Sequence, residues 1–235
     1  MNSKGIIIDK SLQRDTKLYR YMCLSQFMSF VETRKTYLTR LLFWEDKWEV
    51  PTIRFLSEVE SCSNINFNDQ EVKDLYGQCW SLEGVSDALW RIYSREGEGI
   101  LIQTTVQKFD LIQEITYGML SPVIYYDNLR QVSEKLSLET KDNSFLTQGL
   151  FKRKAFEHEK EVRLITLKDE VQIGNKSDSC SRLEISLNPL DFIDEIIIDP
   201  RAKDWYVKTI IDYCKRSGFK ITPQKSDLYC SKDHI

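Results

Sequence analysis

The segment FEHEKEVRLI, residues 156–165, places charged side chains at alternate positions beside an apolar run. If the segment is an extended strand, Glu157, Glu159, Glu161 and Arg163 lie on one face, because successive side chains point to opposite faces. Fixed carboxylates suit chemistry in which positive charge develops on a substrate. The same pattern is typical of the solvated face of an edge strand, and the sequence alone does not decide between the two interpretations.

The bulk composition is that of an ordinary globular protein. The chain has 235 residues, 29% charged residues and a net charge of −3. This length allows a core without metals or disulfides, and we expect an N-terminal arm over residues 1–17 and a single domain over 18–235. The near-neutral charge excludes a surface that is basic throughout. The short basic run Lys152, Arg153 and Lys154 is interpreted as surface side chains near a turn.

Cysteine and histidine usage restricts the chemistry further. The six cysteines form no C-x-x-C pair, and we expect them to be reduced and mostly buried. The two histidines, His158 and His234, are too few for a His-rich metal site, and no metal is expected. No segment has the length of a signal-peptide apolar region or a spanning helix, which predicts a cytoplasmic protein outside the membrane.

Hydrophobic spacing and turn residues predict helices and strands in irregular order. Helices are expected at 24–33, 86–95, 106–115 and 202–219, with Ser86 as an N-cap, and in two pieces over 128–154. Strands are expected at 18–22, 35–41, 78–82, 97–105, 122–126, 156–167, 182–187, 192–200 and 219–223. Because regular βαβ alternation is missing, we predict an α+β fold with a mixed, mostly antiparallel split sheet and flanking helices.

Several short motifs follow one another in a recognisable order. They are LYRYM (18–22), FWEDKWE (43–49), CWS (79–81), LWRIYS (89–94), GEGILI (97–102), FEHEKEVRLI (156–165) and IDEIIIDP (193–200). This set resembles a bacterial family, domain of unknown function 2971, from residue 18 to residue 229. The chain departs from the Asn-Asp-Pro-Phe-Glu loop of that family, of which only the acids Asp46 and Glu49 remain.

The polar residues are also similar in layout to NAD-dependent ADP-ribosyltransferases of the arginine–serine–glutamate branch. That branch has an Arg on the first core strand, a Ser on a middle strand and a Glu-x-Glu pair on a later strand. The matching residues are Arg20, Ser81, Glu159 and Glu161. The resemblance implies an ADP-ribosyltransferase-like fold, NAD as substrate and these four residues as catalytic, with Glu161 facing the cationic sugar and Glu159 as general base.

The same resemblance implies a set of NAD-binding side chains. Arg20 would bind the pyrophosphate through its planar guanidinium, assisted by Arg40 or Arg163. Arg163 could instead pair with Glu161 and keep it ionised. Arg20 also has a structural interpretation, as an arginine paired with an acid at the core edge. The side chains that would enclose nicotinamide, with Ser81 as a positioning group, are Tyr21, Tyr37, Trp80 and Tyr93.

Three functions stay open at this point. The first is an enzyme of a bacterial stress or phage-defence system, such as a toxin, that transfers ADP-ribose from NAD to a protein or nucleic acid or cleaves NAD. The second is a non-catalytic interaction or sensor module of a defence or toxin–antitoxin system that docks a partner protein through loop 43–50. The third is a nuclease that holds magnesium through Asp46, Glu49, Glu159 and Glu161.

Overall fold

The chain folds into two compact units, each made of several chain segments. The computed structural model describes residues 5–46, 48, 74–94, 96–138, 144–168, 171 and 181–230. The first unit takes residues 1–13, 37–79 and 112–185, and the second takes residues 14–36, 80–111 and 186–235. The arm over residues 1–17 and the single domain after it stay predictions.

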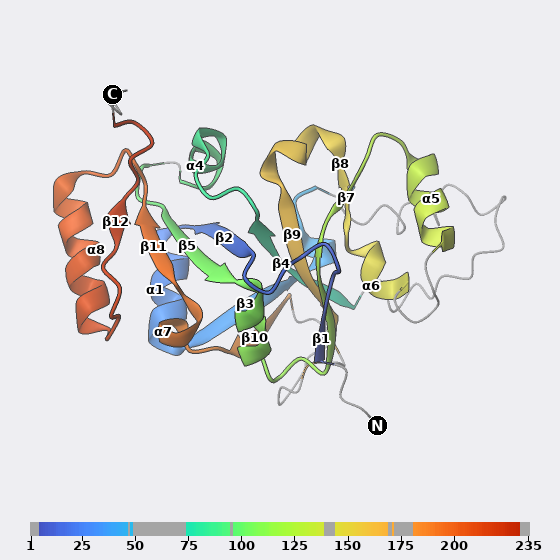
Figure 1. Ribbon diagram of the computed structural model, residues 1–235, viewed down its shortest axis with the longest axis horizontal. Helices are drawn as coiled ribbons and strands as arrows, with labels where there is room; N and C mark the ends of the chain where they lie inside the picture. The colour runs from blue at the N-terminus through green and yellow to red at the C-terminus, as the bar shows by residue number, and fades with distance from the viewer. Residues whose placement is uncertain are drawn as a thin grey trace. The chain divides into compact units, whose positions relative to one another are not determined.

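The first unit is built on the strand order β1, β6, β9, β4 (Figure 1). Strand β6 (Tyr117–Pro122) is antiparallel to β9 (Glu161–Leu167), with Ser121 opposite Arg163, and β1 (Gly5–Ile8) is parallel to β6. Strand β3 (Lys35–Arg40) pairs with β4 (Leu75–Ser81) and with β10 (Arg182–Ser186). A separate parallel pair is formed by β7 (Ile124–Tyr126) and β8 (Phe151–Arg153).

Two helices cover parts of the first unit. Helix α6 (Ser144–Gln148) packs on β9, and α5 (Leu129–Leu138) packs on the β7–β8 pair. The core beneath α6 consists of Leu41, Leu75, Met119, Leu146, Leu150 and Ile165, all buried. Strand β9 is buried along nearly its whole length. Any charged side chain on it must therefore find a partner inside the protein.

The second unit is built on strands β2, β5, β11 and β12. Strand β5 (Ile100–Thr105) is antiparallel to β2 (Lys17–Met22) on one side and to β11 (Glu195–Ile198) on the other, and β12 (Gln224–Lys225) runs parallel to β11. Ser81, at the end of β4, pairs with Tyr19 of β2. This pairing fixes which side chains of the two strands share a face.

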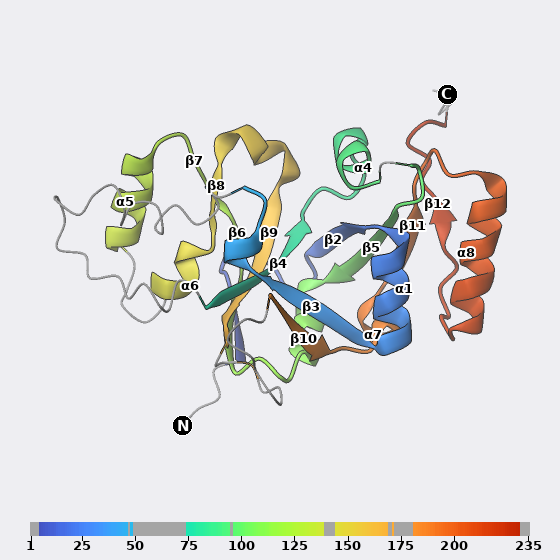
Figure 2. The ribbon, with the colours of Figure 1, turned by 180° about the vertical axis from the view of Figure 1, so that it is seen from behind.

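Helices cover the strands of the second unit. Helix α1 (Leu24–Thr33) packs beside α8 (Asp204–Arg216) through the rings of Phe27 and Tyr213, 6.4 Å apart (Figure 2). Helix α4 (Asp87–Tyr93) follows its N-cap Ser86, whose hydroxyl accepts from Leu89 N at 3.4 Å as predicted. The short helix α7 (Pro189–Phe192) precedes β11.

The predicted fold class is confirmed: helices and strands mix, and most strand pairs are antiparallel. The predicted elements fail where short segments take their conformation from distant contacts rather than from local propensity. Residues 106–111 form the 3-10 helix η3 (Val106–Leu111), and residues 151–153 are strand rather than helix. The region expected as one strand at 122–126 is divided between β6 and β7, and the last strand lies at 224–225 instead of 219–223.

The described cysteines are free, and most are not buried. Cys23 and Cys230 are exposed, Cys79 is half-buried and Cys214 is buried. The expectation of mostly buried thiols is wrong for these four. Cys214 alone occupies the inward face of a long amphipathic helix, which is the position that buries a small apolar side chain.

Candidate functional site

Glu161 is the first residue of β9, and the chain before it is not extended. Residues 154–159 form the 3-10 helix η4 (Lys154–Glu159), and Lys160 follows with φ 43°. The turn is closed by the Lys160 N–H, which donates to the Glu157 carbonyl at 3.2 Å. The predicted strand is therefore wrong before residue 161, and the three acids do not share one strand face.

The Glu161 carboxylate is buried between two cations. Arg163 donates Nε to Oε1 at 2.8 Å and Nη2 to Oε2 at 3.2 Å, and Lys152 donates Nζ to Oε2 at 2.6 Å. Glu161 and Arg163 share a face of β9 because they are two residues apart. The pairing suggested for them by the sequence is thus confirmed.

Glu159 joins the same group through Lys152, whose Nζ also donates to Glu159 Oε2 at 2.7 Å. We call Lys152, Glu159, Glu161 and Arg163 the acid–base cluster. The interpretation of Lys152 as a surface side chain is wrong, because the residue is only 5% exposed. Strand β8 turns Lys152 inward, while its neighbour Arg153 is exposed.

The buried Arg163 side chain has hydrogen-bond acceptors and an aromatic ring around its guanidinium. It is fully buried, and its Nη1 donates to the carbonyls of Gly149 at 2.8 Å and Phe151 at 3.2 Å. Its guanidinium carbon lies 4.5 Å from the ring centroid of Trp44. Arginine suits this position because its planar fork serves several acceptors and an aromatic face at once.

Charge around Glu161 determines its ionisation. Burial raises the pKa of the Glu161 carboxyl, but Arg163 and Lys152, helped by a hydrogen bond from the Cys79 side chain, outweigh burial and lower the pKa to about 2. Glu161 is therefore ionised at neutral pH. An ionised carboxylate of fixed direction can stabilise a developing cation.

Tyr125 and Cys79 complete the surroundings of Glu161, and sequence analysis missed both of them together with Lys152. The Tyr125 hydroxyl accepts from Glu161 N at 2.9 Å. Burial raises the pKa of Tyr125, so the phenol stays protonated. The one signal that could have found Lys152 is charge balance, since two acids beside one arginine at the start of a buried strand require another cation.

A cavity of about 460 Å³ lies in the same unit, between β1, β6 and the segment after α6. Its size is within the usual range of ligand pockets. Thr147 and Leu150 form part of its wall. They flank Gln148 and Gly149, and the Gly149 carbonyl accepts from Arg163. The polar lining of the cavity holds the ammonium groups of Lys10 and Lys135 and the carboxylate of Asp9, which accepts from the Ser11 hydroxyl. The hydroxyls of Ser121 and Thr147 line it as well.

In the second unit, the side chains of Arg20 and Ser81 point to opposite faces of the sheet. Ser81 is directly opposite Tyr19, so its side chain shares the face of Tyr19, and Arg20, the next residue of β2, points the other way. Arg20 lies 5.9 Å from the ring centroid of Trp80 and donates Nη1 to Thr36 Oγ1 at 3.3 Å. The Ser81 hydroxyl accepts from Glu83 N at 2.8 Å. The two side chains therefore point to opposite faces of the sheet, and the roles of Arg20 and Ser81 as site residues stay predictions.

Two of the predicted nicotinamide-binding aromatics do come together. The rings of Tyr21 and Tyr93 are stacked with centroids 6.0 Å apart, and Trp90 meets Tyr21 edge-on at 4.9 Å. The Tyr21 hydroxyl donates to the Gly84 carbonyl at 3.0 Å and accepts from Ser86 N at 3.1 Å. Burial raises the pKa of Tyr21 to about 12.

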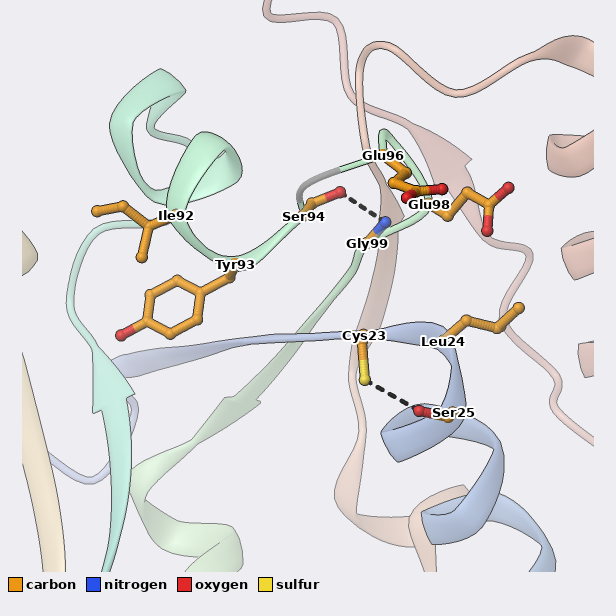
Figure 3. A pocket seen from close by; sticks show the side chains of 9 residues that line it. All are labelled: Cys23, Leu24, Ser25, Ile92, Tyr93, Ser94, Glu96, Glu98 and Gly99. Carbon is orange, nitrogen blue, oxygen red and sulfur yellow. Dashed lines mark hydrogen bonds between the residues drawn. The ribbon is translucent and has the colours of Figure 1, made fainter. Parts of the chain in front are cut away.

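Tyr93 also lines a pocket of about 410 Å³ in the second unit (Figure 3). The thiol of Cys23 and the hydroxyl of Ser25, 3.1 Å apart, face it from the first turn of α1. The Ser94 hydroxyl accepts from Gly99 N at 2.7 Å on the opposite wall. Because Glu96 and Glu98 are among its lining residues, the pocket repels rather than attracts an anionic group.

Tyr37, Arg40 and loop 43–50 belong to other contacts of the first unit. The guanidinium of Arg182 lies 4.8 Å from the Tyr37 ring centroid, and Arg40 Nη2 donates to Asp74 Oδ1 at 3.0 Å. Arg153 donates Nε and Nη2 to Asp46 Oδ2 at 3.1 and 3.0 Å. Residues 47, 49 and 50 lie outside the described part of the chain, and with them Glu49.

The described residues show neither a metal-binding group nor a membrane-spanning helix. Within them, no group of three or more His, Cys, Asp or Glu residues is placed to hold a metal ion. None of the helices in the described ranges is long and apolar enough to cross a membrane. The proposed magnesium ligands Glu159 and Glu161 are both bonded to Lys152.

Comparison with known proteins supports the sequence resemblance over part of the chain. The family model "Protein of unknown function (DUF2971)" matches residues 89–164, which confirms the resemblance to that family there. Comparison with curated proteins gave no match.

Among solved structures the chain is similar to DarT of Thermus sp. 2.9. The complex of that protein with NAD+ has 8% sequence identity and a TM-score of 0.42, with 91% of this chain and 96% of that chain covered. Its complex with ADP-ribosylated ssDNA has 9% identity and a TM-score of 0.41, with 91% and 94% covered.

Proposed function

We propose that the protein is an ADP-ribosyltransferase-like enzyme that uses NAD as its substrate. In this reaction the bond between nicotinamide and the ribose carbon breaks, and neutral nicotinamide leaves. A nucleophile of a macromolecule, or water, adds to the same carbon and gives up its proton. Positive charge builds on the sugar in between, as in glycoside chemistry.

The observation that carries this proposal is the ionised, immobilised carboxylate of Glu161. Arg163 and Lys152 hold both of its oxygens, at distances between 2.6 and 3.2 Å. A carboxylate that is already oriented costs no reorganisation when the sugar becomes cationic. Glu159, bonded to the same ammonium as Glu161, is the candidate base for the nucleophile's proton.

The cavity of the first unit supports a phosphate-bearing substrate. It has a volume of about 460 Å³, and Lys10 and Lys135 are among its lining residues. The two ammonium groups outnumber the single carboxylate of Asp9 in the lining, which suits a pyrophosphate, and the apolar part of the lining, which includes Met119, suits a base or sugar. Arg20 and Ser81 stay predicted site residues, and so do Tyr21, Tyr37, Arg40, Trp80 and Tyr93.

The experiment that tests the proposal is nicotinamide release from NAD by Glu161→Gln. We expect a loss of at least about 100-fold, since a single electrostatic contact to a transition state has this weight. The matched control is Glu157→Gln, which changes an exposed acid on η4 and should keep wild-type activity. Circular dichroism checks that both variants fold, and equal activity of the two variants would refute the assignment.

The acceptor is proposed to be a protein or a nucleic acid, in a bacterial stress or phage-defence system. Incubation with NAD and separate protein, DNA and RNA mixtures, followed by mass spectrometry, would locate the added ADP-ribose. Release of free ADP-ribose without a modified acceptor would instead assign the protein as an NAD glycohydrolase.

A second candidate function, a non-catalytic docking module, is favoured by two observations. Arg163, Lys152 and Cys79 together supply donors for the roughly four acceptor positions of the Glu161 carboxylate, as in a structural ion cluster. In loop 43–50, Phe43 is 60% exposed. A partner protein could cover this ring, because exposed aromatic side chains are frequent anchors of interfaces.

The docking hypothesis predicts that Phe43 contributes little to the stability of the isolated chain. Phe43→Ser should leave the free energy of unfolding in urea within about 0.5 kcal/mol of wild type, as for other exposed positions. Trp44, whose ring packs on Arg163, is the comparison, and Trp44→Ser should cost several times more. A large decrease in the free energy of unfolding of Phe43→Ser would mean that the Phe43 ring stabilises the first unit itself and is not a docking surface.

A further inference from the structure

Lys152 occupies a special position in the acid–base cluster. The cluster has two carboxylates and two cations, and Lys152 Nζ contacts Glu159 at 2.7 Å and Glu161 at 2.6 Å. Its side chain is 6% exposed, so these contacts lie in a medium of low dielectric constant, where an unpaired charge is costly. Lys152 therefore both balances the charge of the cluster and joins its two acids.

The two cations differ in their freedom to move. Arg163 is anchored by the carbonyls of Gly149 and Phe151 in addition to Glu161. Lys152 has a flexible four-carbon chain and a point charge without directional fork geometry. Because Glu159 already contacts its Nζ, Lys152 can leave Glu161 and still be paired.

We propose that Lys152 is a positioning residue of this site, which holds Glu161 in the free protein and stays with Glu159 when a substrate hydroxyl takes its place on Glu161. This assignment rests on the proposed function for its substrate, the ribose of NAD. Its electrostatic part, the pairing of two buried acids through one ammonium, is independent of any substrate. The two parts can therefore be tested separately.

Removal of Lys152 should give the cluster a new pH dependence. The groups around Glu161 are then Glu159 from η4, Arg163 from β9, Tyr125 from β7 and Cys79 from β4. Two buried carboxylates would share one guanidinium, and the second of them would take up a proton above its ordinary pKa. The folded variant would then bind a proton more readily than its unfolded chain, so its stability deficit should shrink as pH falls.

The test compares Lys152→Met with Lys154→Met by urea unfolding at pH 7.5 and 4.5. Lys154 is the matched control, because it lies two residues away with a side chain 55% exposed and pairs loosely with Asp127 at 3.5 Å. We expect Lys152→Met to lower the unfolding midpoint strongly at pH 7.5 and by no more than about half as much at pH 4.5. Lys154→Met should change neither midpoint. The assignment would be overturned if the two variants had equal unfolding midpoints, or if Lys152→Met lowered the midpoint by the same amount at both pH values.

A double variant tests the pairing itself. Glu159→Gln removes one of the two acids, so in the Lys152→Met background it leaves Glu161 with Arg163 alone and restores neutrality. We expect the double variant to unfold at a higher urea concentration than Lys152→Met, and Lys152→Arg to recover part of the midpoint as well. If the double variant unfolded at a lower urea concentration than Lys152→Met, this would contradict the pairing of both acids with the Lys152 ammonium.

The activity measurement separates this inference from the proposed function. For nicotinamide release, the acid limb in the pH profile of kcat/KM should lie at higher pH in Lys152→Met than in wild type, where Lys152 and Arg163 together keep the Glu161 carboxylate ionised. An acid limb at the same pH as in wild type, in an active Lys152→Met variant, would overturn the positioning role. If wild type releases no nicotinamide while the midpoints behave as expected, the proposed function fails and the electrostatic assignment stands.

Discussion

Replacement of Arg163 by Met lowers the free energy of unfolding by about 3–5 kcal/mol, the cost of breaking a buried ion pair. Arg163 is fully buried, and the variant leaves Glu161, 3% exposed in its side chain, with one cation fewer. The carbonyls of Gly149 and Phe151 lose their donor as well. Met fills most of the volume, so the loss reports charge and hydrogen bonding rather than a cavity. Urea unfolding at pH 7 measures it.

Arg130→Met is the matched control for this experiment. Arg130 pairs with Glu134 one helical turn away, with side chains 87% and 61% exposed. Such a pair contributes at most about 1 kcal/mol, and the substitution removes the same guanidinium. If Arg163→Met costs no more than Arg130→Met, the acid–base cluster does not stabilise the first unit and Glu161 is not held as described.

The effect of Arg163→Met should also depend on pH. The folded-state pKa of Glu161 is about 2, below the ordinary value of 4.5, so the folded protein binds this proton less readily than the unfolded chain. The stabilisation by Arg163 is therefore complete above pH 4.5 and is lost as pH falls toward 2. The difference in the free energy of unfolding between wild type and Arg163→Met should therefore become smaller as pH falls from 4.5 toward 2. A difference that stays constant over this range would contradict the pairing of Arg163 with Glu161.

Replacement of Arg201 by Ala is the second substitution with a large expected effect, about 2 kcal/mol or more. Arg201 donates Nε to Asp199 Oδ1 at 3.0 Å and Nη2 to Oδ2 at 2.7 Å, and the Asp199 side chain is fully buried. Its Nη2 also donates to the carbonyls of Trp90 and Ser94 at the end of α4. The variant loses the cation that faces a buried carboxylate and frees the helix end.

Arg91→Ala controls for the loss of an arginine beside α4. Its partner Asp87 is one turn away on the helix surface, with side chains 62% and 46% exposed, so solvent screens the pair and we expect almost no change. Burial raises the pKa of Asp199, but the hydrogen bonds from Arg201 lower it below its ordinary value. Thermal and urea unfolding of both variants would show the difference, and equal losses would mean that Asp199 is solvated.

Local sequence patterns account for the elements that were predicted correctly. The apolar spacing of residues 24–33, the N-cap Ser86 and the helical pattern predicted over 202–219 correspond to α1, α4 and α8. Each of these signals acts within a few residues of chain. The same holds for the pairing of Glu161 with Arg163, because a strand places residues two apart on one face.

Features that depend on pairing between distant segments were predicted less well. The Tyr19–Ser81 register places Arg20 and Ser81 on opposite faces, and a shift by one residue would have reversed this. Lys160, with its left-handed backbone, interrupts the strand predicted from residue 156. Residues 157 and 159 therefore do not lie on the strand face that the alternation predicts.

The burial of Lys152 could not be predicted from the sequence. Composition and spacing place a lysine in a short basic run, and such a lysine is normally exposed. Its burial follows from two acids that reach the same point from η4 and β9. Burial is a property of the assembled unit, since the free energy of a charge depends on all the groups that replace its water. The alternation that brings Arg163 beside Glu161 is, in contrast, a property of the extended backbone and needs no distant partner.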